Sequence, residues 1–284
     1  MPEMLQYSFM VRALLGAAMV GALAPAFGVF LVLRRLSLIA DTLSHVALAG
    51  VAIGLLTKIF PPYVALVATS LVAVAIEQLR SRRLLPGDAA LAVFLYAALA
   101  VAVVIISVAD GFNADLFGYL FGSMLSTTVD DLWLLFGLLI AVFAFVTVFY
   151  SELAQSSFDP DLARISGVRV GLVNSGLAVL TAATITLAMR IVGVLLVGAM
   201  IVVPVLISLR LVTGLRATIV TASVVGLLVA LGGVTVAFYT DVAAGGAVVL
   251  TGITVLLSAE IWTFLRKKVL PPGGLGAGSE DSVG

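Results

Sequence analysis

The stretch RRLSLIADTLSHVALAGVAIG, residues 34–54, combines two features that decide the fold. Its second half is a run of Val, Ala, Leu and Gly that continues as an apolar helix. Its first half places Asp41 four residues before His45, which is the only histidine of the chain. In a helix, positions i and i+4 lie on one face, one turn apart. A carboxylate and an imidazole placed in this way can both ligate a divalent cation such as zinc, manganese or iron.

Two structural roles compete with metal binding for this pair. Asp41 suits an N-cap, whose carboxylate accepts hydrogen bonds from the free N–H groups of a helix that starts near Thr42. His45 suits a packed side chain bonded to a backbone carbonyl. In a water-soluble domain these roles are the commoner ones, since Asp-x-x-x-His alone is a weak pattern. In a membrane, where ionisable groups are costly, a functional role is the default hypothesis.

Composition settles the environment of the chain. Of its 284 residues, 62% are hydrophobic and 11% are charged, and the mean hydropathy is +1.26. Soluble domains carry about 25% charged residues, so most of this surface must face lipid or other apolar helices. We therefore predict an all-α, polytopic helical membrane protein. The formal net charge of zero argues against nucleic acid as a partner, and the absence of cysteine excludes disulfides and thiolate metal sites.

Nine apolar runs have about the length that spans a bilayer. They cover residues 10–33, 42–58, 62–79, 89–109, 131–150, 171–189, 191–209, 217–238 and 247–265. The number falls to eight if the short second segment is re-entrant. With the C-terminus in the cytoplasm, twelve of the 15 Lys and Arg residues lie on the cytoplasmic side, and only Arg12, Lys58 and Arg190 lie outside. Residues 1–270 are then a transmembrane domain, and residues 271–284 a disordered, Gly-rich tail.

The most polar interior stretch is SELAQSSFDPDLARISGVR, residues 151–169. Asp159 is a good N-cap, Pro160 a good first helical residue, and Gly167 a good stop. These signals predict a helix of about two turns over residues 160–166. Such a helix is too short to span a membrane, so it should lie along the cytoplasmic face. It either presents itself to a partner or simply connects two spans.

The sequence lacks the Walker A pattern, so ATP-driven work would need a partner protein, and we expect no enzyme activity. One histidine without cysteine cannot build a closed four-ligand zinc site, and we expect no permanently bound cofactor. A sparse site suits transit, because a transported ion must also leave. The alternative is a proton-coupled secondary transporter with Asp41 and His45 as a relay. In that case Glu77, Glu260 or Asp88 would join the relay, although we expect Glu77 and Glu260 to reach out to water near cytoplasmic helix ends.

Nearly the whole chain resembles the membrane permeases of bacterial ATP-binding-cassette (ABC) importers for zinc and manganese. Five motifs in the family's order carry the resemblance: GVFLVLRRLSLIADTLSHVALAGVAIG (28–54), LFGSML (120–125), SFDPDLARISGV (157–168), IVGVLLVGAMIVVP (191–204) and YTDVAAGGAVVL (239–250). The last motif departs from the family, which commonly has a proline after the aspartate and a Gly-Pro pair later.

The resemblance implies a type II ABC importer-like permease in the cytoplasmic membrane. It would be a homodimer carrying two copies of a cytoplasmic ATPase, and a separate extracytoplasmic metal-binding protein would deliver zinc or manganese. Asp41 and His45 would match the acidic and histidine residues of the family's translocation path. The region 157–168 would match the coupling helix that docks on the ATPase, with Asp159, Pro160, Asp161, Ala163, Arg164 and Gly167 as the matching residues.

Overall fold

The computed structural model describes residues 4–82, 84, 86–108, 118–119 and 127–269. Over these residues the chain is helical without any strand, which confirms the predicted all-α class. After a short 3-10 helix, Met4–Gln6, the elements are α1 (Ser8–Leu33), α2 (Ile39–Thr57), α3 (Pro61–Ser81), α4 (Gly87–Val108), α6 (Val129–Val148), α7 (Tyr150–Phe158), α8 (Pro160–Ile165), α9 (Val170–Val192), α10 (Val194–Leu211), α11 (Leu215–Thr240) and α12 (Ala244–Val269). The predicted tail, 271–284, and the motif at 120–125 lie outside the described residues.

Each of the nine predicted apolar segments corresponds to one helix. Within the described part of the chain, eight helices are long and apolar enough to cross a membrane, namely α1, α2, α3, α4, α6, α9, α11 and α12. The remaining one, α10, is apolar but shorter. The short segment is therefore the seventh and not the second. The reason is Gly193, which ends α9 and precedes α10 with a φ of +86°, a conformation that suits glycine. Ile191 and Val192 therefore belong to α9 and not to α10.

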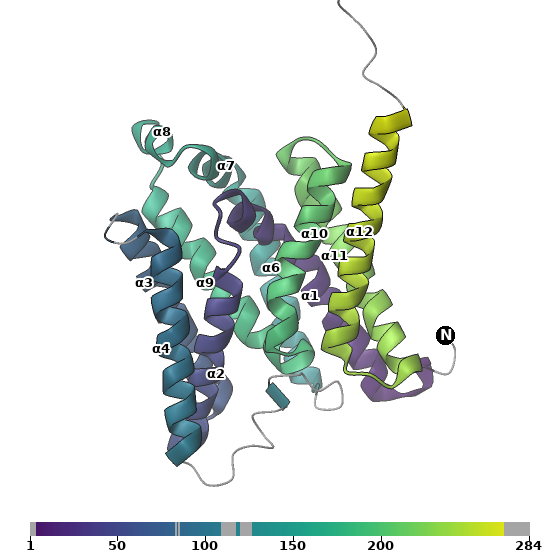
Figure 1. The fold of residues 1–284 in the computed structure, drawn as a ribbon. Coiled ribbons are helices and arrows are strands. Elements are labelled where there is room, and N and C mark those ends of the chain that lie inside the picture. The colour runs from purple at the N-terminus through teal and green to yellow at the C-terminus, as the bar shows by residue number, and fades with distance from the viewer. Residues whose placement is uncertain (1–3, 83, 85, 109–117, 120–126, 270–284) are drawn as a thin grey trace, which may run out of the picture.

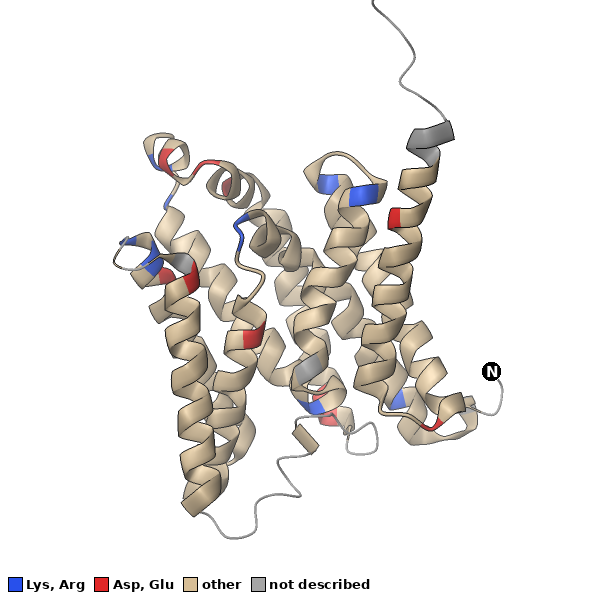
Figure 2. Cartoon of the chain, viewed as in Figure 1, with Lys and Arg blue, Asp and Glu red and all other residues tan. Residues whose placement is uncertain are grey.

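The two ends of the bundle differ in charge. Figure 1 shows the long helices side by side, with α7 and α8 lying across one end. The C-terminal end of α12 reaches the same end of the molecule, while the N-terminal end of α1 lies at the opposite end. Most of the Lys and Arg residues gather at the α7 and α8 end (Figure 2). This arrangement agrees with an odd number of crossings and with the expected bias of positive charge.

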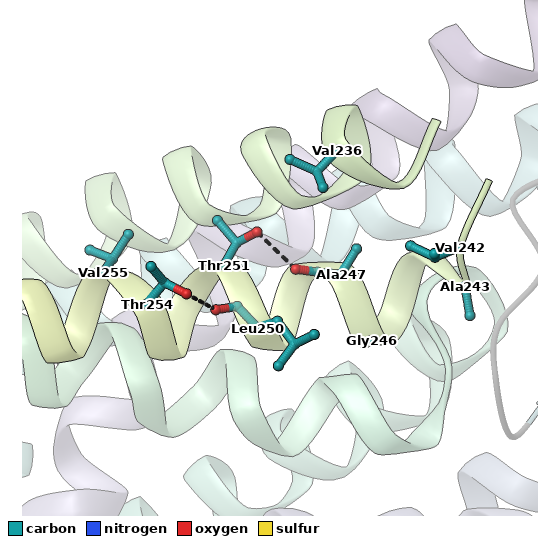
Figure 3. A pocket seen from close by; sticks show the side chains of 9 residues that line it. All are labelled: Val236, Val242, Ala243, Gly246, Ala247, Leu250, Thr251, Thr254 and Val255. Carbon is teal, nitrogen blue, oxygen red and sulfur yellow. Dashed lines mark hydrogen bonds between the residues drawn. The ribbon is translucent and has the colours of Figure 1, made fainter. Parts of the chain in front are cut away.

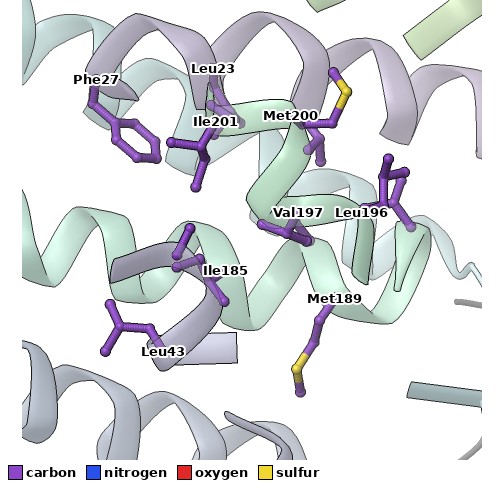
Figure 4. Close-up of a cluster of buried hydrophobic side chains, with 14 of the residues drawn as sticks. Leu23, Phe27, Leu43, Ile185, Met189, Leu196, Val197, Met200 and Ile201 are labelled. Atoms are coloured by element: carbon purple, nitrogen blue, oxygen red, sulfur yellow. The ribbon is translucent and has the colours of Figure 1, made fainter. Parts of the chain in front are cut away.

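Helix α1 runs through the middle of the packing and contacts α6, α9, α10 and α11. A cluster of buried hydrophobic side chains forms the core where α1, α2, α9 and α10 meet (Figure 4). The side chains there include Leu23, Phe27, Leu43, Ile185, Met189, Leu196, Val197, Met200 and Ile201, all of them buried. Leu43 places the start of α2 in this core, and the rest of α2 packs mainly against α3 and α4.

The contact of α1 with α11 depends on glycine. A Cβ placed on Gly21 would lie 2.6 Å from the carbonyl oxygen of Gly226 and 2.8 Å from Cβ of Ala230. Neither neighbour is the flexible end of a long side chain, so the helices would have to separate. Small residues at such positions let helices approach closely inside a membrane, where packing takes over from the hydrophobic effect.

We predict that Gly21→Ala lowers the stability of the bundle by roughly 1–3 kcal/mol, because the added methyl group forces α1 away from α11. The measurement is the thermal unfolding midpoint of the detergent-solubilised protein. The matched control is Gly137→Ala on α6, where a Cβ would meet nothing within 4 Å. The control should be neutral or stabilising, by up to about 1 kcal/mol, through helix propensity. Equal stability of the two variants would contradict the prediction.

Candidate metal pathway and coupling end

Helix α2 carries the predicted pair. Its N-cap is Leu38, so Asp41 lies inside the first turn, where the helix dipole favours a carboxylate. The alternative role of Asp41 as N-cap is therefore wrong. Most residues of α2 are buried, but the side chain of Asp41 is 55% exposed and that of His45 is 20% exposed. The pair thus lies in the first turns of α2, with Asp41 half exposed and His45 mostly covered.

The pair has a spacing that one ion could bridge. Nε2 of His45 lies 3.6 Å from Oδ1 of Asp41. Two ligands at about 2.0–2.1 Å from a tetrahedral zinc ion lie about 3.4 Å apart, so little side-chain movement would be needed. Nδ1 of His45 is buried without a hydrogen-bond partner among the described residues, so the alternative of a backbone-bonded histidine does not hold. The ring also lacks the second hydrogen bond that usually fixes a metal-bound histidine.

Two neighbouring helices pass close to the pair. Thr42 Oγ1 donates to the carbonyl oxygens of Leu38 and of Leu91, the latter on α4. On α10, a Cβ at Gly198 would lie 4.0 Å from the backbone nitrogen of Asp41. Sequence reasoning overlooked Ser44, whose buried hydroxyl has no hydrogen-bond partner in the described part of the chain, unlike those of most helical Ser and Thr residues there. The described residues contain no cluster of three His, Cys, Asp or Glu side chains that could hold a metal by itself.

A cavity of about 560 Å³ lies elsewhere, between α11 and α12 (Figure 3). Its walls are apolar apart from Thr251 and Thr254. Each of these hydroxyls donates to the carbonyl oxygen four residues earlier on α12, of Ala247 and Leu250 respectively. This cavity offers a cation no charged ligand, so Asp41 and His45 remain the candidate metal ligands.

A buried polar network at the α7 and α8 end joins residues far apart in the sequence. The guanidinium of Arg34 donates to Ser156 Oγ, Ser157 Oγ and Asn174 Oδ1 at 2.7, 2.9 and 2.6 Å. Asn174 Nδ2 in turn donates to Glu77 Oε1 at 2.7 Å. Burial lowers the pKa of Arg34 to about 10, against the opposing effect of Glu77. Arg34 therefore remains charged at neutral pH.

The structure corrects the expectation for Glu77. We expected this side chain to reach water at a helix end, but its residue is only 6% exposed. Besides the bond from Asn174, its carboxylate forms an ion pair with Arg80 at 3.0 Å. By contrast, Glu260 is 42% exposed and pairs with Arg210. Asn174 lies on α9, far away in the sequence, which is why α3 alone gave no signal that Glu77 is buried.

The predicted helix at 160–166 is confirmed as α8. Asp159 Oδ1 accepts hydrogen bonds from the backbone N–H groups of Asp161 and Leu162. At the other end Gly167 has a φ of +85°. The N–H groups of residues 167 and 168 donate to the carbonyl oxygens of residues 164 and 163, which is a Schellman turn. Asp159 and Gly167 thus cap the two ends of α8 as the sequence predicted.

The residues matched to the coupling helix divide into separate roles. Asp159, Pro160 and Gly167 form the ends of α8, Ala163 is buried, and Asp161 and Arg164 form an exposed ion pair at 2.9 Å. Sequence reasoning missed three apolar side chains that project outward at this polar end, Phe158, Leu162 and Ile165, which are 70%, 59% and 84% exposed. A cleft of about 560 Å³ between α7 and α8 lies beside them.

Comparison with known proteins gives a consistent result. A model of the ABC 3 transport family matches residues 6–263. A probable metal transport system membrane protein of Treponema pallidum is 35% identical over 89% of this chain and 95% of its own length. The manganese import system permease protein ScaB of Streptococcus gordonii is 31% identical over 93% and 96%. The high-affinity zinc uptake system membrane protein ZnuB of Haemophilus influenzae is 29% identical over 86% and 94%.

A solved structure agrees with these relatives. The structure of PsaBC from Streptococcus pneumoniae in complex with Fab superposes with a TM-score of 0.79, at 30% sequence identity. The match covers 90% of this chain and 92% of that one.

We predict that Asp41→Asn and His45→Ala change the free energy of unfolding by no more than about 1 kcal/mol, because neither side chain holds a structural hydrogen bond. Asn174→Leu should lower it by roughly 3 kcal/mol, because it leaves buried Glu77 and Arg34 short of partners. Chemical unfolding of the purified protein in detergent compares the three. A large loss for Asp41→Asn or His45→Ala would mean that the pair has a structural role.

Proposed function

The chain belongs to the ABC 3 transport family, and from this membership we propose that it is the membrane permease of an ATP-driven importer for manganese or zinc. It is a multi-pass membrane protein and a transporter component, with ATP hydrolysis left to a separate subunit. The observation that carries the proposal is the pair in the first turns of α2, where an acid and an imidazole lie one turn apart at 3.6 Å. Both metals accept this pair of ligand types.

The two ligands of one chain suggest a homodimer. Zinc prefers four ligands, and one chain offers an acid and a histidine. Because the side chain of Asp41 is half exposed, a second copy related by a two-fold axis could bring its own pair opposite. Two pairs, with water where manganese needs more ligands, would complete the coordination. Such a shared site would come apart when the two copies move, which suits release of the ion.

The α7 and α8 end is the proposed docking surface for the ATPase. It combines the exposed apolar side chains of Phe158, Leu162 and Ile165 with the cleft beside them. Apolar side chains at the polar end of a membrane protein favour a protein partner over lipid. The bias of Lys and Arg toward this end supports its placement in the cytoplasm. The extracytoplasmic metal-binding protein would then meet the opposite end.

The proposed mechanism is alternating access. ATP binding would draw two ATPase subunits together, move the two α8 helices with them, and switch the pathway between outward and inward openings. The proton-relay alternative is not favoured. It would need further titratable groups near Asp41 and His45, and Glu77 is held in the network of Asn174 and Arg80.

We predict that His45→Ala and Asp41→Asn each lower manganese or zinc uptake by roughly tenfold or more, because each removes a metal ligand. The assay is metal accumulation in cells that lack their other uptake systems. Thr57→Ala, at the far end of the same helix, is the control and should keep parental uptake. Uptake should also survive a protonophore as long as ATP is maintained. Unchanged uptake by His45→Ala would reject the proposed role of the pair.

We predict that Ile165→Asp and Leu162→Asp weaken association with the ATPase by about tenfold or more, because a desolvated charge replaces an apolar contact. Co-purification of the ATPase with the tagged permease measures this effect. Leu211→Asp is the matched control, since Leu211 is 50% exposed and ends α10. Equal co-purification of all variants would show that α8 is not the docking surface.

A further inference from the structure

The guanidinium of Arg34 is bonded to the chain on both sides of α8. On the side that precedes α8, Nη2 donates to Ser156 Oγ and Nε to Ser157 Oγ, both on the last turn of α7. On the side that follows, Nη1 donates to Asn174 Oδ1 on the first turns of α9. Since most of α8 itself is exposed, these two flanks decide where it stands relative to the bundle.

Each flank is also tied to the rest of the bundle. Ser156 and Ser157 both donate to the carbonyl oxygen of Leu153, whose side chain is fully buried. Asn174 donates to Glu77 on α3, so a fourth helix restrains the same group. Each polar side chain of this network has at least one hydrogen-bond partner, and such a network restrains the helices that it joins. If α8 is displaced, either Arg34 moves with it or charge-assisted hydrogen bonds break.

Arg34 is also attached to the start of α2. It is the C-cap of α1, and the N–H groups of Arg35 and Leu36 donate to the carbonyl oxygens of Val32 and Leu31 in a Schellman turn. Leu36 and Ile39 are buried, which holds the short connection between the two helices in place. Asp41 follows in the first turn of α2. A movement of the guanidinium thus reaches the metal pair through a short, tightly bonded segment.

We propose that Arg34 is the positioning residue that transmits the movement of α8 to Asp41 and His45. This inference rests on the proposed function and adds the residue through which ATPase and metal pathway are coupled. The three nitrogens of Arg34 keep the two flanks of α8 together, and the turn after Arg34 carries their displacement into α2. Without this group ATP is still hydrolysed, but Asp41 and His45 no longer switch between outward and inward access in step with hydrolysis.

The test uses the permease with the ATPase that co-purifies with it and the metal-binding protein, reconstituted in liposomes. Manganese or zinc uptake and phosphate release are measured together, which gives the metal transported per ATP hydrolysed. We expect Arg34→Gln to keep ATP hydrolysis within about twofold while this ratio falls at least fivefold, the lower range of coupling between sites. Arg34→Lys should show the same loss, since one ammonium group cannot replace three guanidinium nitrogens placed in a plane.

A second variant distinguishes loss of coupling from misfolding of the arginine variants. Ser156→Ala with Ser157→Ala removes only the acceptors on one flank, and it should lower the ratio in the same direction. Arg82→Gln, at an exposed position at the end of α3, and Ser81→Ala, whose hydroxyl bonds only to its own helix, are the matched controls and should keep the ratio.

The outcomes separate the two proposals. A parental ratio in both Arg34→Lys and the double serine variant overturns the role of Arg34, while metal uptake by the wild-type complex still supports the proposed function. Restoration by Arg34→Lys alone would mean that only the charge matters, and it also overturns the inference. A wild-type complex that hydrolyses ATP without moving either metal rejects the proposed function itself.

Discussion

A charge withdrawn from water must find all its hydrogen bonds within the protein, and Arg34 shows how this chain meets that constraint. Its guanidinium is bonded to α7 and α9, and Asn174 extends the bonding to Glu77 on α3. An unpaired charge there would cost several kcal/mol, so these helices must meet at one point. That meeting point fixes both the start of α2 and the position from which α8 projects.

The same constraint explains why Asp41 and His45 stand out. The buried charges of the network are paired, whereas Asp41 and His45 lie 3.6 Å apart and Nδ1 of His45 has no partner among the described residues. In a protein with only 11% charged residues, polar groups left without structural bonds favour a role in binding. The network around Arg34 has its hydrogen bonds made within the protein, whereas the proposed metal ligands Asp41 and His45 do not.

The sequence predicted the features that depend on local signals. The long helices follow from apolar runs of bilayer length, and α8 follows from Asp159, Pro160 and Gly167, which cap it through bonds within a few residues. The burial of Glu77 could not be predicted, because its partner Asn174 lies 97 residues away. The outward direction of Leu162 and Ile165 also depends on tertiary packing, since an apolar residue on a short helix is as readily buried. Gly193, which shortens α10, can be read from the sequence, but its positive φ cannot.

The turn between α1 and α2 has an unusual residue for its conformation. Arg35 takes a φ of +58°, at the C′ position where helices usually place glycine. A non-glycine residue in this region costs roughly 1–2 kcal/mol, and here the two Schellman hydrogen bonds hold it. Glycine would remove this strain but would also make the connection softer, because it allows many more backbone conformations. A stiff turn carries a displacement from Arg34 into α2, whereas a flexible turn would absorb it. The non-glycine turn therefore fits the proposed coupling of α8 to Asp41 and His45.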